Sequence, residues 1–113
     1  MSQSDARRAR WRADLHDYGA DALRTAGLPA MADEHATAAA EQRTYAELMD
    51  ELAAAKAGNA ANPGSEWHAT NLRATKIKVA AYRETQRLLG APRPGVINNF
   101  SEPTDAELIE AGY

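Results

Sequence analysis

The sequence has no cysteine, only five prolines, a single phenylalanine and no long uninterrupted run of apolar residues. Without cysteine, neither a disulfide framework nor a thiolate metal site can form. No segment approaches the roughly 20 consecutive apolar residues of a membrane-spanning helix. The first twelve residues lack the apolar segment of a secretion signal, so we expect a cytoplasmic protein with no membrane partner.

Large apolar side chains are also scarce. Of the 113 residues, 26 are alanine and only 24 are larger apolar types. Alanine loses no side-chain entropy in a helix, so this composition favours helices. Burial of one large apolar side chain contributes about 1.5–3 kcal/mol, whereas fixing one residue's backbone costs about 1–2 kcal/mol. Because 24 such residues make a thin core for a lone chain, we expect self-association.

Turn-forming residues divide the chain into helices. The first predicted helix covers about residues 5–26 and ends at Gly27. The second begins at Pro29, a residue that the first turn of a helix tolerates. Apolar residues recur at helical spacing in both, and we expect these stripes to face the core. The stripes are Trp11, Leu15, Tyr18 and Ala22 in the first helix, and Met31, His35, Ala38, Tyr45, Leu48, Met49 and Leu52 in the second.

The clearest break in the sequence is the segment 58–64, Gly-Asn-Ala-Ala-Asn-Pro-Gly. The Gly-Asn pair is expected to end the second helix, and Asn-Pro-Gly to form a turn. Ser65 is a good N-cap for a third helix, which should continue to Leu89 and end at Gly90. We therefore predict an all-α fold: a long helical hairpin, an N-terminal helix packed against it, and an extended C-terminal tail.

Apolar residues of the third helix span an arc of about 200°, about twice the width that one-sided packing needs. One side carries Trp67, Ala74, Ile77, Ala81 and Leu88, and the other carries Leu72, Val79, Tyr82 and Leu89. We therefore predict that this hairpin forms a homo-oligomer, as a closed symmetric ring. The residues predicted to make contacts between subunits are Leu72, Ile77, Val79, Tyr82 and Leu88.

The last segment, residues 91–113, is predicted to be a tail separate from the helical domain of residues 1–90. Val96–Phe100 is a candidate short strand, and Thr104 with Glu107 matches the capping box of a short terminal helix. We expect this tail to contact neighbouring chains or a partner protein, with disordered solvation as the alternative. Its predicted contact residues are Val96, Ile97, Phe100, Leu108 and Ile109.

The net charge of −3 conceals a strong segregation of charge along the chain. Residues 1–12 carry +3, residues 13–57 carry −6, residues 58–90 carry +3, and residues 91–113 carry −3. Two basic elements could contact the phosphates of double-stranded DNA. They are a basic arm of Arg7, Arg8, Arg10 and Arg12 around Trp11, and a basic ridge of Arg73, Lys76, Arg83 and Arg87.

Each basic element also has an alternative interpretation. The arm could be solvated charge beside an aromatic residue that begins the apolar stripe of its helix. The ridge could instead form salt bridges to the acidic second helix, within one subunit or between subunits. In a ring, repetition of either element would create a strong site for a polyanion.

The remaining polar residues give no catalytic pattern. The three histidines lack the spacing of a helical zinc site, and we expect them to be surface or partly buried side chains. A row of three aspartates is expected to be a solvated acidic face, because no nearby motif supplies a base, a nucleophile or a phosphate loop. These residues are His16, His35 and His68, and Asp14, Asp17 and Asp21. We predict no enzyme activity, no cofactor and no metal.

Along the chain, an N-terminal helix with aromatic residues leads through Gly-Leu to a long alanine-rich helix that contains a tyrosine. The hinge Gly58-Asn59…Asn62-Pro63 follows, and then a basic helix that closes in Leu88-Leu89-Gly90-Ala91-Pro92 before an acidic tail. This layout resembles the small terminase subunits of tailed bacteriophages. The chain differs from many members in lacking a clear N-terminal helix-turn-helix, which bears on sequence-specific reading of DNA more than on assembly.

The resemblance implies a ring-forming, non-enzymatic DNA-packaging adaptor. Such an adaptor would deliver viral DNA to a separate motor subunit, the large terminase, in the host cytoplasm. The alternative is a structural component of the virion or of the head–tail neck, which would need the same broad apolar helix. A small metal-dependent hydrolase is a third and more distant hypothesis.

Overall fold

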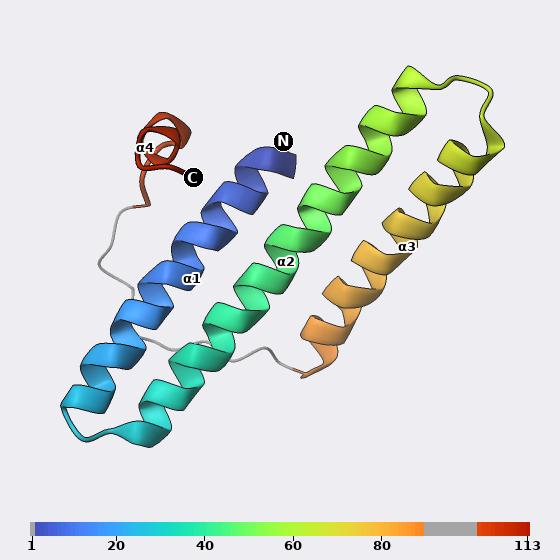
Figure 1. The fold of residues 1–113 in the computed structure, drawn as a ribbon. Coiled ribbons are helices and arrows are strands. Elements are labelled where there is room, and N and C mark those ends of the chain that lie inside the picture. Colours follow the sequence, from blue (N-terminus) through green and yellow to red (C-terminus); the bar gives the residue numbers. More distant parts are fainter. Residues whose placement is uncertain (1, 90–101) are drawn as a thin grey trace.

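The computed structural model describes residues 2–89 and 102–113. It contains α1 (Ser2–Thr25), α2 (Pro29–Ala61), α3 (Glu66–Leu89) and α4 (Asp105–Glu110). The central helix is α2, flanked by α1 on one side and α3 on the other, and the short α4 lies against α1 (Figure 1). Because the described residues form no strand, the prediction of an all-α fold is confirmed.

The three long helices form a single layer. The molecule measures 57 × 34 × 19 Å along its principal axes, whereas one helix with its side chains is about 10–12 Å across. Figure 1 shows α1, α2 and α3 side by side, with α1 antiparallel to α2 and α2 antiparallel to α3. In a single layer, few side chains are covered on all sides. Whether an apolar side chain is buried or exposed therefore depends on how its helix is rotated about its own axis.

The interface between α1 and α2 is built from alanine. The buried alanines of α1 lie at steps of three, four and seven residues, which places them along one face of the helix. Those of α2 lie at steps of seven residues, also on one face, and meet them. The small methyl groups allow the two backbones to approach closely. The residues of this alanine seam, each at most 1% exposed, are Ala6, Ala9, Ala13 and Ala20 in α1, and Ala32, Ala39 and Ala46 in α2.

The predicted apolar stripe of α1 is wrong, because these larger side chains lie on the face opposite the alanine seam. Tyr18 is 76% exposed, Ala22 is exposed, and Trp11 and Leu15 are only half-buried. The prediction assumed that the larger apolar side chains of α1 face the core, whereas α1 and α2 pack through their alanines. The stripe predicted in α2 is mostly buried or half-buried, with Met31 as the exposed exception.

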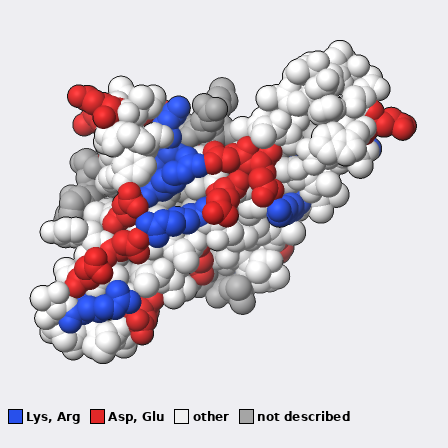
Figure 2. Space-filling model, in the orientation of Figure 1, with Lys and Arg blue, Asp and Glu red and all other residues white. Residues whose placement is uncertain are grey.

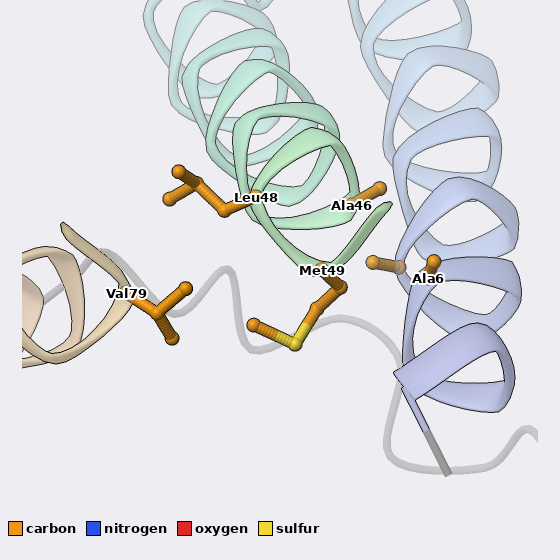
Figure 3. Close-up of a cluster of buried hydrophobic side chains, with 6 residues drawn as sticks. Ala6, Ala46, Leu48, Met49 and Val79 are labelled. Atoms are coloured by element: carbon orange, nitrogen blue, oxygen red, sulfur yellow. The ribbon is translucent and has the colours of Figure 1, made fainter. Parts of the chain in front are cut away.

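The predicted helical hairpin of α2 and α3 is confirmed, and it holds the larger apolar side chains of the core. Figure 3 shows Met49 of α2 between Val79 of α3 and Ala6 of α1, so this methionine joins the two interfaces. Around this cluster the half-buried Tyr82 donates a hydrogen bond from its hydroxyl to the carbonyl of Glu41, at 2.9 Å.

The hairpin turn begins later than the sequence predicted. The helix α2 does not end at Gly58-Asn59 but continues to Ala61. The side-chain amide of Asn62 donates to the carbonyl of Gly58 at 2.8 Å, which gives one of the last carbonyls of the helix a partner. The chain then turns at Gly64, whose φ of +86° suits glycine, and Ser65 caps α3 as predicted.

The terminal helix α4 forms with the predicted capping box. The Thr104 hydroxyl accepts a hydrogen bond from the amide of Glu107 at 3.2 Å, and the Glu107 carboxylate accepts one from the amide of Thr104 at 3.0 Å. This helix packs on α1 of its own chain, so the described part of the tail is not separate from the helical domain. The candidate strand Val96–Phe100 lies outside the described residues.

The alanine seam yields a prediction with a matched control on adjacent residues. Ala39 is buried against α1, whereas Ala40 is exposed on the same helix. Ala39→Leu should reduce the free energy of unfolding by about 1–3 kcal/mol, because the added atoms must separate the two helices. Ala40→Leu should change it by less than about 0.5 kcal/mol. Urea denaturation followed by circular dichroism measures both, and equal losses would show that Ala39 is not in a close interface.

Candidate functional site

The basic arm lies on α1 beside the C-terminal residues of the same chain. Arg8 donates to the carbonyl of Pro103 at 3.0 Å. It also donates to the carboxylates of Glu102 and Asp105, at 3.2 and 3.3 Å. Arg12 donates two hydrogen bonds to Glu102, at 2.8 and 2.5 Å. The hydrogen bonds from Arg12 are the main reason that the pKa of Glu102 lies below its usual range.

The other two arginines of the arm differ from each other. Arg10 pairs with Asp50 and so joins α1 to α2. Arg7 has no ion pair within the described residues. Three of the four arginines of the basic arm are therefore engaged inside the chain, where they hold α4 and α2 against α1. The sequence missed this arrangement because the partners of Arg8 lie more than 90 residues away.

The aspartate side chains of α1 are exposed to solvent, as the sequence predicted, and Asp14 and Asp17 also pair with a basic residue of α2. Arg43 of α2 pairs with Asp17 at 2.6 Å and with Asp14 at 2.9 Å. The hydrogen bond to Asp17 is the main reason that the pKa of Arg43 is raised. Tyr113 donates its hydroxyl to Asp14, and this bond raises the pKa of Tyr113 to about 12. Figure 2 shows basic and acidic side chains interleaved over α1 and α2 on this face.

The basic ridge lies on α3 and is exposed along its length. Arg73 makes a hydrogen bond to Thr70 of its own helix at 3.1 Å, and Lys76 has no ion pair within the described residues. Arg87 pairs with Glu84 at 2.6 Å, and this hydrogen bond raises the pKa of Arg87. Both of these side chains are largely exposed, so such a pair contributes little to stability and opens readily.

The fourth residue of the ridge, Arg83, is attached to α2. Its guanidinium donates to the hydroxyl of Tyr45 at 3.0 Å and lies 5.7 Å from the centre of that ring. The predicted alternative, a salt bridge from the basic helix to the acidic second helix, is made by a different residue. Lys78 pairs with Glu51 at 3.0 Å.

The predicted contact residues between subunits fall on two opposite faces of α3. Val79 is buried in the core of the single chain, and Tyr82 and Leu72 are half-buried. Their assignment to contacts between chains is corrected: Val79 and Tyr82 pack within the chain's own core. Ile77 and Leu88 are each 70% exposed. Of the five, Ile77 and Leu88 are therefore the residues most accessible to another chain.

The predicted contact residues of the tail are also divided. Leu108 is 1% exposed, so its assignment to another chain is corrected: it lies on the helix that packs against α1. Ile109 is 55% exposed and is available to a partner. The other three, Val96, Ile97 and Phe100, lie outside the described residues.

Two histidines meet inside the alanine seam. His16 of α1 and His35 of α2 are buried, and their Nδ1 atoms are 3.0 Å apart. Burial, and to a lesser degree His35, lowers the pKa of His16 below its ordinary value of 6.5, and Asp17 opposes this shift. The signal that could have revealed the pair is spacing, because both histidines continue the three-and-four repeat of the seam alanines.

The third histidine connects the two sides of the hairpin turn. His68 Nδ1 lies 2.8 Å from the hydroxyl of Ser65, and its Nε2 lies 3.3 Å from the side-chain amide of Asn62. A methyl group at Gly58 would come within 3.1 Å of the His68 ring, so this glycine allows the close approach. The same Ser65 hydroxyl accepts the His68 amide as the cap of α3, and these contacts stabilise the turn.

Comparison with known proteins identified no matching family model, no matching curated protein and no matching solved structure. The described residues contain no cluster of three or more histidine, aspartate or glutamate side chains that could hold a metal ion. None of the described helices has the length and hydrophobicity needed to cross a membrane.

The packing of α4 predicts a local effect of Leu108→Ala. The loss of this buried side chain should allow α4 to detach while the long helices stay folded, because α4 contacts α1 alone among the described helices. Hydrogen exchange should show faster exchange in residues 102–113 and unchanged protection in α2 and α3. Ile109→Ala is the matched control, because that side chain is exposed. Faster exchange throughout the molecule would contradict a local role.

The buried histidine pair predicts how stability depends on pH. Because folding lowers the pKa of His16, the unfolded chain takes up a proton that the folded chain resists. The free energy of unfolding should therefore be at its full value above pH 6.5, where His16 is neutral in both states, and should fall as the pH drops below 6.5. Urea denaturation at a series of pH values between 5 and 8 measures the slope.

Two single variants separate the histidine pair from other titrating groups. His16→Gln should reduce the pH dependence in this range, since it removes one member of the pair. His68→Gln should retain it, because His68 lies outside the seam. If the two variants have the same slope, the histidine pair is not the source.

Proposed function

We propose that this chain is a non-enzymatic helical adaptor that associates with copies of itself and binds double-stranded DNA through its phosphates. The observation that carries the proposal is the free side of α3, where exposed cations of the basic ridge lie beside exposed apolar side chains. Self-association would repeat the ridge and strengthen its attraction for a polyanion.

The ridge is the better candidate for DNA contact than the basic arm. Arg73, Lys76 and Arg87 are exposed and need break at most an exposed ion pair to reach a phosphate. In contrast, Arg8 and Arg12 would have to leave the carboxylates that hold α4. We therefore assign phosphate contact to the ridge first, with Arg7 as the available member of the arm.

The proposed biological role follows the resemblance to small terminase subunits. In that role the chain forms a ring, collects viral DNA and delivers it to a motor subunit, which could contact the exposed Ile109. One observation favours the second candidate, a structural component of the virion or neck. Three arginines of the basic arm already have partners inside the chain, as expected of a module without a nucleic-acid ligand.

A gel-shift series with a salt titration tests the proposal. The triple variant Arg73→Gln, Lys76→Gln, Arg87→Gln should bind DNA more than tenfold more weakly than wild type. Its dependence on salt should also be shallower, because each lost phosphate contact removes about 0.9 from the log–log slope. Base sequence should matter little for either protein.

The matched control removes the same number of positive charges elsewhere. Arg24→Gln, Lys56→Gln, Lys78→Gln changes three exposed residues outside the ridge and should weaken binding far less. Equal losses in both triple variants would mean that net charge, and not the ridge, attracts DNA. If the wild type does not bind DNA at low salt, the adaptor proposal is wrong and the structural component is favoured.

A further inference from the structure

The exposed apolar residues of α3 form a regular seam. Trp67, Ala74, Ala81 and Leu88 are spaced seven residues apart, and Ile77 lies between them at the matching position of the repeat. A seven-residue repeat keeps a stripe facing one partner helix along its whole length. The three large members, Trp67, Ile77 and Leu88, are each about 70% exposed, at 68%, 70% and 70%. We call these five residues the outer seam.

The outer seam lies on the side of α3 that faces away from α2. At about 100° per residue, Ile77 lies opposite the midpoint between Thr75 and Val79, the buried residues of α3. Among the described residues α3 packs on α2 alone, so the outer seam is uncovered. Another helix could therefore bind it without displacing any residue of the core.

Charge indicates which partner and which direction fit the outer seam. The flanks of α3 are basic apart from Glu66 in the first turn and Glu84 near the end. A parallel copy would place basic residues beside their own counterparts, which is unfavourable. An antiparallel copy places Glu66 of each chain beside the last turn of the other, where Arg87 lies, and two-fold symmetry makes this contact twice.

The sizes of the seam residues fit the same arrangement. With the two-fold axis near Ile77, the two isoleucines meet at the centre and the small Ala74 and Ala81 lie beside it. Trp67 of one chain then reaches the end of the seam where Leu88 of the second copy lies. A bulky residue is thus present at the centre and at both ends, with close backbone approach between them.

We propose that the outer seam binds a second copy of this chain, with the two α3 helices antiparallel about a two-fold axis near Ile77. The proposal rests on the self-association within the proposed function and not on DNA binding. A helix of 24 residues is about 36 Å long, so the contact strip is smaller than the ~800 Å² per partner of a standard interface. We therefore expect a reversible dimer, and a ring would need a second contact surface.

The absence of cysteine makes cross-linking a direct test of this geometry. A disulfide forms only when two Cα atoms come within about 7 Å, so each introduced cysteine reports its nearest counterpart. Ile77→Cys alone should give a covalent dimer on mild oxidation. Leu88→Cys alone should not, but a mixture of Trp67→Cys and Leu88→Cys should give a linked pair.

The cross-linking experiment needs a control position, and two results would contradict the proposed geometry. Ala40→Cys, an exposed position on α2, should remain monomeric and sets the background from random collision. Efficient linkage of Leu88→Cys to itself would mean parallel helices and would overturn the proposal. So would linkage at Ile77 that does not exceed the background.

A second variant separates this proposal from the proposed function. Ile77→Glu should abolish the dimer in sedimentation while leaving the helical content unchanged, because the side chain is exposed. An unchanged dimer would overturn the outer seam as the interface. DNA binding measured on the wild type is independent of this result, so a dimer without DNA binding would refute the adaptor and leave the seam in place.

Discussion

The close approach of α1 and α2 through alanine is the constraint on which the rest of this structure depends. Alanine allows two helices to pack with little separation, but each methyl group buries little apolar area. The chain has few larger apolar residues, and the seam uses almost none of them. Those that remain are divided between the interface of α2 with α3 and the surface of the layer, where Trp67 and Ile77 are exposed.

Polar contacts beside the alanine seam join α1 to α2 and hold α4 against α1. Arg43 and Arg10 join α1 to α2 on the outside, and the buried histidine pair joins them on the inside. Exposed ion pairs contribute at most about 1 kcal/mol each, so their main effect is to select one register and to hold α4. The same arginines cannot bind a phosphate while they make these contacts. Within the two basic elements, the cations that remain available are therefore Arg7 of α1 and the exposed residues of the ridge on α3.

The sequence predicted the parts of the fold that local chemistry decides. Alanine content and turn residues predicted the helices and the hairpin, and the capping box at Thr104 predicted α4. The stripe of α1 was wrong because alanines and larger residues both repeat at helical spacing, and spacing alone does not say which face a partner helix covers. Contacts such as Arg8 with Glu102 carry no local signal, because they depend on how distant segments pack.

Hydrogen exchange measured at two protein concentrations tests the central claim most directly. The alanine seam is complete within one chain, whereas we propose that a second copy covers the outer side of α3. Dilution should therefore speed exchange in α3 while exchange in the seam segments of α1 and α2 stays the same. Equal exchange of α3 at both concentrations, with the chain monomeric throughout, would contradict the account.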